Sequence, residues 1–138
     1  MDLGFKTIGN ATLIVHDHNP ALVTDPWIKG SAYFRSWVRS YEIPAEQLQA
    51  IANCEYIWLS HGHPDHLSIR SLNPLKDKKI LLADHAGERI ANDLRGLKFN
   101  IQVMKDRVWT NLSPRINAAS VTDYNQDSLW PVVHGCNS

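Results

Sequence analysis

Residues 56–66 read Tyr56-Ile57-Trp58-Leu59-Ser60-His61-Gly62-His63-Pro64-Asp65-His66. The first four are apolar, and the last six hold three histidines and one aspartate. A short apolar run of this kind is typical of a strand that is buried on both faces, as in a sheet flanked by helices. The polar residues follow at the carboxyl end of that strand, where open α/β sheets usually bind ligands. The stretch therefore predicts a central strand and a functional loop.

The sequence on either side predicts a layered α/β (α+β) domain with a mixed β-sheet flanked by helices. Two β-branched runs separated by turn residues at 16–20 indicate a hairpin. Helices are expected where apolar residues recur with helical spacing, and Pro44 suits a first helical position. The expected strands are 4–8, 12–15, 21–24, 55–60, 79–83, 99–103, 108–110 and 115–122, and the expected helices are 44–52, 68–72 and 86–95.

Composition narrows the class of protein. The 138 residues, 43% of them hydrophobic and 20% charged, suit one globular domain with a buried core. The formal net charge of zero gives no electrostatic reason to expect nucleic acid or an anionic membrane as a partner. The first residues lack the pattern of a secretion signal, so a cytoplasmic setting is expected. Cys54 and Cys136 are too few for a disulfide framework.

The loop after the central strand has the chemistry of a metal site. His61 and His63 are two residues apart, so in an extended segment both side chains project to the same side. Asp65 and His66 then add a carboxylate and an imidazole. The other interpretation, histidines that only form hydrogen bonds, must tolerate repulsion among crowded cations. We therefore expect one or two divalent ions, zinc first, with Mn²⁺ or Fe²⁺ as alternatives.

The arrangement His-x-His-x-Asp-His at residues 61–66 resembles the signature motif of the metallo-β-lactamase-fold superfamily of metal-dependent hydrolases. Gly9-Asn10-Ala11-Thr12, Thr24-Asp25-Pro26-Trp27 and the run 56–60 also resemble segments of that family. The branch that the chain resembles most includes lactonase-like enzymes, N-acyl-phosphatidylethanolamine phospholipase D and sialic-acid hydroxylase relatives. The resemblance covers the chain as far as about Leu129.

The resemblance implies a four-layer αββα sandwich, of which residues 1–138 would be the N-terminal half, a single but incomplete domain. His61 and His63 would bind a first metal ion, and Asp65 and His66 a second. Asp25 would orient a ligand from behind the site. A metal-bound hydroxide, steered by Asp65, would attack an ester, lactone, amide or phosphodiester of a small-molecule substrate.

The chain also departs from the family pattern. No histidine stands on the downstream strand that should supply a third ligand, although Asp123 could substitute for it or serve only in a loop. His134 and Cys136 are ligand types near the end of the chain, and Pro131 is expected to interrupt a strand there. His85 is interpreted as a helix-start residue.

These departures leave alternatives open. One is a catalytically inactive metal-binding remnant, and another is an interaction module. A half-sandwich would also expose an apolar face, so homodimerisation, aggregation or marginal stability is expected.

Two further features have plain structural interpretations. His16 and His18 have ligand-like spacing but are expected at an exposed hairpin tip. The aromatic and basic segment from Trp27 to Tyr41 is expected to pack over the hairpin, or else to cover a cleft with arginines that hold an anionic substrate.

Overall fold

The computed structural model describes residues 2–9, 11–28, 42–60, 67–84, 88–122 and 129–135. Within these ranges the chain alternates strands and short helices. The elements are β1 (Leu3–Gly9), β2 (Thr12–Asp17), β3 (Asn19–Thr24), α1 (Ala45–Asn53), β4 (Tyr56–Leu59), α2 (Ile69–Leu72), the 3-10 helix η1 (Asn73–Leu75), β5 (Lys79–Ala83), α3 (Glu88–Gly96), β6 (Asn100–Met104), β7 (Thr110–Ser113), β8 (Ile116–Thr122) and β9 (Leu129–Gly135).

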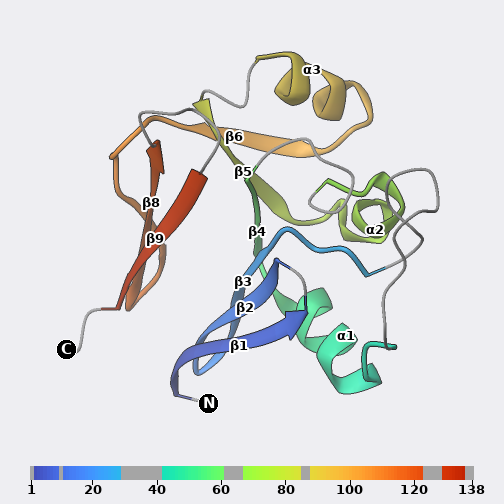
Figure 1. The fold of residues 1–138 in the computed structure, drawn as a ribbon, viewed down its shortest axis with the longest axis vertical. Helices are drawn as coiled ribbons and strands as arrows, with labels where there is room; N and C mark the ends of the chain where they lie inside the picture. The colour runs from blue at the N-terminus through green and yellow to red at the C-terminus, as the bar shows by residue number, and fades with distance from the viewer. Residues whose placement is uncertain are drawn as a thin grey trace.

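A six-stranded mixed sheet in the order β1-β2-β3-β4-β5-β6 forms the centre of the molecule (Figure 1). Strands β1 to β3 pair antiparallel, and β3 to β6 pair parallel. Each parallel connection moves one strand further in the same direction across the sheet. Because such crossovers share one hand, they place their helices on one face of the sheet.

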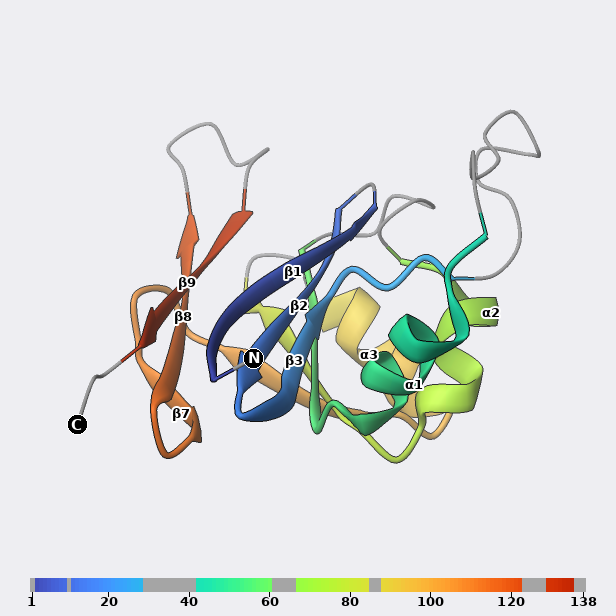
Figure 2. The same cartoon turned by 90° about the horizontal axis from the view of Figure 1, so that it is seen from below.

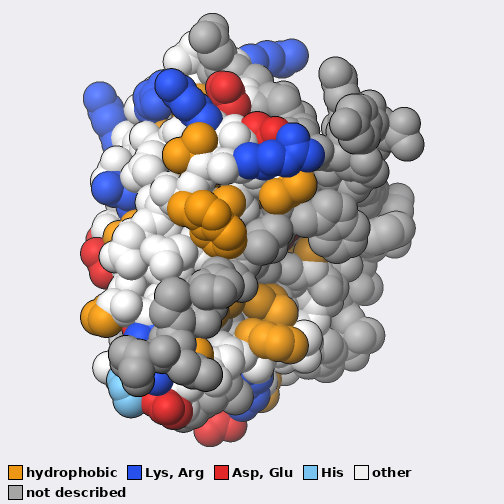
Figure 3. All heavy atoms as spheres, turned by 90° about the vertical axis from the view of Figure 1, so that its left-hand side faces the viewer, with side chains coloured by type: hydrophobic (Ala, Val, Ile, Leu, Met, Phe, Trp, Pro, Cys, Tyr) orange, Lys and Arg blue, Asp and Glu red, His pale blue; other side chains and the backbone are white. Residues whose placement is uncertain are grey.

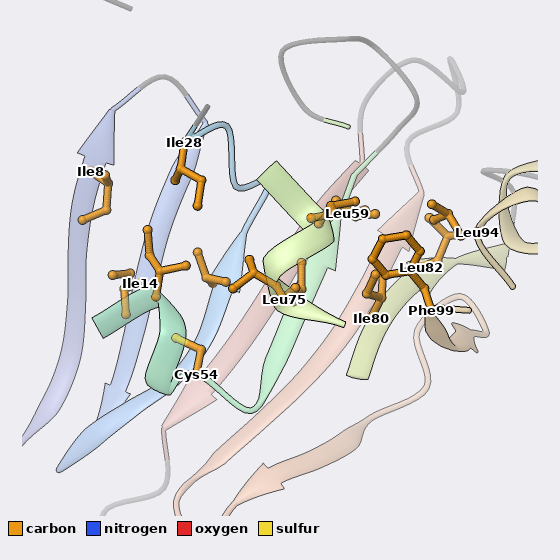
Figure 4. Packing of buried hydrophobic residues seen from close by; sticks show 14 of the residues in the cluster. Ile8, Ile14, Ile28, Cys54, Leu59, Leu75, Ile80, Leu82, Leu94 and Phe99 are labelled. Atoms are coloured by element: carbon orange, nitrogen blue, oxygen red, sulfur yellow. The ribbon is translucent and has the colours of Figure 1, made fainter. Parts of the chain in front are cut away.

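The helical face carries a continuous apolar core. The strands contribute side chains such as Ile57 and Leu82, and the helical layer contributes Ile51, Leu72 and Leu94, all with at most 2% of their surface exposed. Figure 4 shows Leu59, Ile80 and Leu82 of the strands pointing into the same layer as Leu75 and Phe99. This contact layer explains why β4 and β5 consist almost entirely of apolar residues.

The opposite face of the large sheet is covered by a smaller antiparallel sheet in the order β7-β8-β9. Figure 2 shows the helices on one side of the large sheet and the small sheet on the other. Between the sheets lies a second apolar cluster, which includes Val15, Leu22, Trp58, Leu81 and Ile116. The alternation of Ile57 and Leu59 with Trp58 thus divides β4 between the two cores.

The expected α+β organisation around a mixed sheet is confirmed, and two local expectations are wrong. The hairpin turn does not extend over 16–20: β2 and β3 pair as far as Asp17 and Asn19, and only His18, with φ 60°, forms the tip. Pro131 does not interrupt its strand, because β9 pairs with β8 on both sides of it. A proline is tolerated there because β9 is an edge strand, where a missing N–H group need not break a ladder.

No helix in the described ranges is long and apolar enough to cross a membrane.

Candidate functional site

One edge of the large sheet collects the carboxyl ends of its parallel strands. Asp25 follows β3, Ser60 follows β4 and Asp84 follows β5. A parallel bridge between Asp106, just after β6, and Ser120 aligns β8 with these strands. The carboxyl end of β8 therefore points to the same edge, which is where sheets of this type bind ligands.

The predicted metal ligands leave from this edge but lie outside the described residues. This holds for His61, His63, Asp65 and His66, and for the possible ligand Asp123; His85, interpreted as a helix-start residue, also lies outside the described residues. The described part of the chain contains no group of three or more histidine, cysteine or acidic residues that could hold a metal ion. A metal site at this edge would therefore need residues outside the described ranges, such as those of the loop 61–66.

Asp25 binds the residue that precedes this loop. Its side chain has 4% of its surface exposed, and its two carboxyl oxygens accept hydrogen bonds from Ser60. The Ser60 backbone N–H donates to Oδ1 at 2.8 Å, and the Ser60 hydroxyl donates to Oδ2 at 2.7 Å. The backbone N–H of Asp25 donates in turn to the Trp58 carbonyl at 2.8 Å. The end of β4 is thus fixed against the end of β3.

Buried hydroxyl groups hold the segment after Asp25. The Thr12 hydroxyl donates to the Asp25 carbonyl at 2.9 Å and accepts from the Trp27 N–H at 3.3 Å. The Ser71 hydroxyl, on α2, accepts from the Ile28 N–H at 2.8 Å. Sequence reasoning assigned no role to these hydroxyl groups. Serine and threonine are mostly exposed residues, and only the fold reveals that these two are buried.

His16 and His18 do not contribute to this edge. His18 is at the exposed hairpin tip, as expected, and its Nδ1 is 2.8 Å from Oδ1 of Asp2. His16 pairs with Pro20 at the end of the hairpin that is remote from Asp25. Its Nδ1 is buried and has no hydrogen-bond partner, and burial lowers the pKa of its imidazole below the usual 6.5. A neutral ring suits this position.

Cys54 is a core residue. The thiol has no exposed surface and donates to the Ala50 carbonyl at 3.4 Å. Burial raises the pKa of this thiol to about 12, so the thiolate that binds metals is disfavoured.

His134, a ligand type near the end of the chain, lies on β9. Its backbone pairs with Asn117, whereas the carboxyl end of β8 pairs with Leu129. Five residue steps along the strand separate His134 from Leu129, a distance of roughly 17 Å. Cys136 lies outside the described residues.

Comparison with known proteins gives relatives of two kinds. The cytidine monophosphate-N-acetylneuraminic acid hydroxylase of Xenopus laevis is 29% identical over 111 residues, which are 76% of this chain and 19% of that protein. The same hydroxylase of Gorilla gorilla gorilla is 36% identical over 108 residues, or 74% of this chain and 18% of that protein. A Mycobacterium tuberculosis protein described as a Rieske 2Fe-2S iron-sulfur protein is 29% identical over 96 residues, or 68% of this chain and 18% of that protein.

Solved structures show the same fold at low sequence identity. CmlA, a diiron β-hydroxylase from Streptomyces venezuelae, matches with a TM-score of 0.68 and 14% identity, over 95% of this chain and 27% of that one. An isothiocyanate hydrolase from Delia radicum gut bacteria matches with a TM-score of 0.57 and 22% identity, over 80% of this chain and 44% of that one. No family model matches the chain. The chain spans about a fifth of the length of the curated relatives it matches.

These findings correct the predicted family, function and metal. The assignment to the metallo-β-lactamase superfamily is wrong, because the curated relatives are hydroxylases and Rieske iron-sulfur proteins. The predicted zinc hydrolase is wrong for the same reason. The two alternatives, an inactive metal-binding remnant and an interaction module, gain no support from these relatives. The prediction of zinc is also wrong, because one curated relative is named as a Rieske 2Fe-2S protein and CmlA is named as a diiron β-hydroxylase. The hydrolase match is too distant to show more than a fold.

Proposed function

We propose that this chain carries the iron site of a hydroxylase. The observation that supports the proposal most is the similarity to named hydroxylases over about three quarters of the chain. The matched residues are only 19% of that hydroxylase, so its substrates do not transfer to this chain. A small-molecule substrate and a cytoplasmic setting remain part of the proposal.

The donor set of the loop 61–66 suits iron. Imidazole nitrogens and carboxylate oxygens are ligands of non-haem iron, and two histidines with one carboxylate form its most familiar protein site. His61, His63, Asp65 and His66 offer three imidazoles and one carboxylate. Iron held there would supply the redox chemistry that oxidation of a C–H bond requires.

A Rieske cluster does not fit this chain. Such a cluster is held by two cysteine thiolates and two histidines. The sequence has two cysteines, and Cys54 has no exposed surface and a pKa of about 12. One cysteine would then remain, which is too few. We therefore propose histidine- and carboxylate-bound iron, without inorganic sulfide, as the metal of this segment.

The contribution of the protein is to place the loop and to shield it. The C-terminal strand edge presents the loop, and Asp25 fixes Ser60 immediately before it. The apolar layers on both sides of β4 exclude water from the strand that precedes the loop. A dry and rigid base of this kind favours a single ligand geometry.

Anaerobic loading of the 138-residue chain with Fe²⁺ tests the proposal. We expect the wild-type chain to retain iron after desalting, and to consume oxygen in the presence of ascorbate. The double variant His61→Ala/His63→Ala should lose both properties, because it removes two of the four proposed donors. Elemental analysis and an oxygen electrode provide the two measurements.

A variant with a carboxylate removed from the same edge serves as the control. Asp84 is exposed and follows β5, so Asp84→Ala should retain iron. Iron that stays bound in the double histidine variant would contradict the proposed site. A wild-type chain that holds iron yet consumes no more oxygen than the double variant would contradict the proposed hydroxylase chemistry.

A further inference from the structure

Strand β1 forms one edge of the large sheet, and no described strand pairs with its outer side. Figure 1 shows β1 as the last strand at the lower end of that sheet. Three successive residues in its middle, Phe5, Lys6 and Thr7, are exposed. The unpaired backbone groups of such an edge can add a strand from another chain, and natural proteins usually protect them.

The hydrogen bonds between β1 and β2 determine which backbone groups of β1 point outward. The His18 N–H donates to the Asp2 carbonyl at the end of this antiparallel pair. Hydrogen-bonded positions alternate along such a pair with positions that are not bonded. The register runs without a shift over residues 3–7, so Gly4 and Lys6 bond to β2 as Asp2 does. The N–H and C=O groups that point away from the sheet are therefore those of Leu3, Phe5 and Thr7.

β1 lacks most of the usual protections of an edge strand. The edge strand β9 contains Pro131, which has no N–H to donate, whereas β1 contains no proline. The shift in the register of β1 lies beyond Thr7, so it leaves the outward groups of residues 3–7 in line. Lys6 is the only charged residue of the strand. A single lysine excludes some pairings of this edge and permits others.

The outward-bonding residues also share one face of β1. Phe5 lies opposite Val15, whose side chain belongs to the core between the two sheets. The small sheet leaves Phe5 uncovered, with 65% of its surface exposed. Leu3 and Thr7 are two residues away on either side, so their side chains project from the same face. A large aromatic side chain thus stands at the centre of the row of free backbone groups.

We propose that β1 pairs antiparallel with β1 of a second copy of this chain, about a two-fold axis at Phe5. In this register Phe5 lies opposite Phe5 of the second copy, and Leu3 lies opposite its Thr7. All the outward N–H and C=O groups of these residues then form hydrogen bonds between the copies. The two aromatic rings come into contact on the face turned toward the small sheets, where each is otherwise exposed to water.

Charge and strand length select this register over its neighbours. With the axis at Phe5, Lys6 lies opposite Gly4 of the second copy and meets no charge. With the axis at Lys6, two lysines would lie directly opposite each other, which is unfavourable. With the axis at Gly4, Thr7 would have no partner in a strand that begins at Leu3. The sequence of β1 is therefore complementary to itself, which is the reason to choose a second copy as the partner.

The pairing buries only one strand edge in each copy, so the dimer should be weak. Specific, stable interfaces bury at least roughly 1,200 Å² of surface, which is more than an edge of five residues supplies. We therefore expect sedimentation analysis of the 138-residue chain to show a monomer that converts to a dimer as the concentration rises. The inference is independent of the proposed iron site, so the metal-free chain is used.

Thr7→Pro tests the backbone pairing. The change removes an N–H that points away from β2, so the bonds between β1 and β2 remain. In a symmetric dimer it removes two hydrogen bonds, and we expect the dissociation constant to rise by about 10- to 100-fold. Thr7→Val is the matched control, because it keeps the N–H and a β-branched side chain, and it should associate like the wild type. A folded Thr7→Pro chain that associates like the wild type would overturn the inference, as would a wild-type chain that stays monomeric at every concentration.

Disulfide formation tests the register and remains decisive if Thr7→Pro does not fold. In a Cys136→Ser background, Phe5→Cys should give a disulfide-linked dimer under mild oxidation, because Cα atoms of opposite bonded residues are about 5.5 Å apart. Thr7→Cys is the control, since its two Cα atoms would be roughly 14 Å apart, too far for a disulfide. Equal cross-linking of the two variants would mean another register or random collision, and either would overturn the inference.

Discussion

At the scale of single residues, Cys54 distinguishes two kinds of iron chemistry. Its thiol is fully buried with a pKa of about 12, so it cannot serve as a cluster ligand without unfolding of the surrounding core. We expect reconstitution with iron and sulfide to give no Rieske-type absorption or EPR signal on this chain. Cys54→Ala should retain the wild-type iron content and lose about 1 kcal/mol of stability through the smaller buried side chain. An iron–sulfur signal that disappears in Cys54→Ala would contradict this assignment.

His16 gives a prediction about pH. Burial, followed by the positive charges of the N-terminus and Lys6, lowers the pKa of its imidazole below 6.5. Because the pKa of His16 is lower in the folded state, the unfolded chain binds this proton more readily, and protonation favours unfolding. The stability contributed by the neutral imidazole is therefore complete above pH 6.5, and it is lost as the pH falls from 6.5 towards the lowered pKa. Urea unfolding at pH 7.5 and 5.5 should show this loss in wild type and a smaller loss in His16→Gln. Equal pH dependence in both proteins would exclude His16 as the cause.

The site residues differ in how far the sequence predicts them. His61 and His63 stand out because dense histidines have few structural uses, but they lie outside the described residues. The family resemblance predicts a role for Asp25 behind the metal site, and the structure shows that the Asp25 carboxyl group binds Ser60. Ser60 could not be singled out by its residue type, because what distinguishes it is its position directly before the loop 61–66. Thr12 and Ser71 could not be predicted, because a buried hydroxyl is indistinguishable in sequence from an exposed one.

At the scale of elements, one polar contact joins the hairpin β2–β3 to the turn between β7 and β8. Arg115 donates from Nε to Oδ1 of Asp17 at 2.7 Å and from Nη2 to Oδ1 of Asp2 at 2.8 Å. The Ser113 hydroxyl donates to Oδ2 of Asp17 at 2.7 Å. The two sheets are therefore linked at the end of the molecule opposite the candidate site.

This contact predicts how the chain responds to acid. The Ser113 hydroxyl and then the Arg115 guanidinium hold the pKa of Asp17 below its usual 3.8. A carboxyl group with a lowered pKa stabilises the fold above 3.8, and the contribution is lost as the pH falls through the lowered value. Arg115→Ala should lower the Tm at pH 7 and weaken its dependence on pH below 4. Arg89→Ala, which removes an exposed pair with Asp93 at 4.0 Å, should change the Tm several times less. Equal shifts in the two variants would mean that the contact does not link the sheets.

Element prediction succeeded where apolar patterning was strong. The strand at 79–83 was predicted from its apolar run and is observed as Lys79–Ala83. The helix expected at 44–52 is observed at Ala45–Asn53, because Pro44 caps it instead of entering it. The expectation that Pro131 interrupts a strand is wrong for β9, because the sequence does not reveal that this strand lies at a sheet edge.

At the scale of the whole molecule, the mixed sheet could be predicted but the layering on its second face could not. Apolar runs on β4 and β5 require cover on both faces, and the helical spacing of 44–52 and 86–95 identified the cover of one face. The small sheet covers the other face through Leu112, Ile116 and Ala118, which form no continuous apolar stretch. Their pairing is non-local, and a single sequence contains no signal for which distant strand they meet.

The expected homodimer remains a prediction, and the surface gives it a test. Figure 3 shows hydrophobic side chains across the middle of the face on the side of β8 and β9. Among the described residues, Phe5, Val108 and Trp109 have 65%, 51% and 53% of their surface exposed. Large exposed apolar side chains favour association because contact removes them from water. Light scattering should therefore show self-association that rises with protein concentration.

A polar substitution should weaken that association. Phe5→Thr introduces a β-branched residue suited to a strand, and it removes the most exposed aromatic side chain among the described residues. Leu48→Gln is the matched control, since Leu48 is 40% exposed on α1, on the helical side of the large sheet. We expect Phe5→Thr to shift the chain towards the monomer and Leu48→Gln to leave its association unchanged. A wild-type chain that is monomeric at every concentration and unfolds in one sharp transition would show that the exposed side chains are tolerated without a partner.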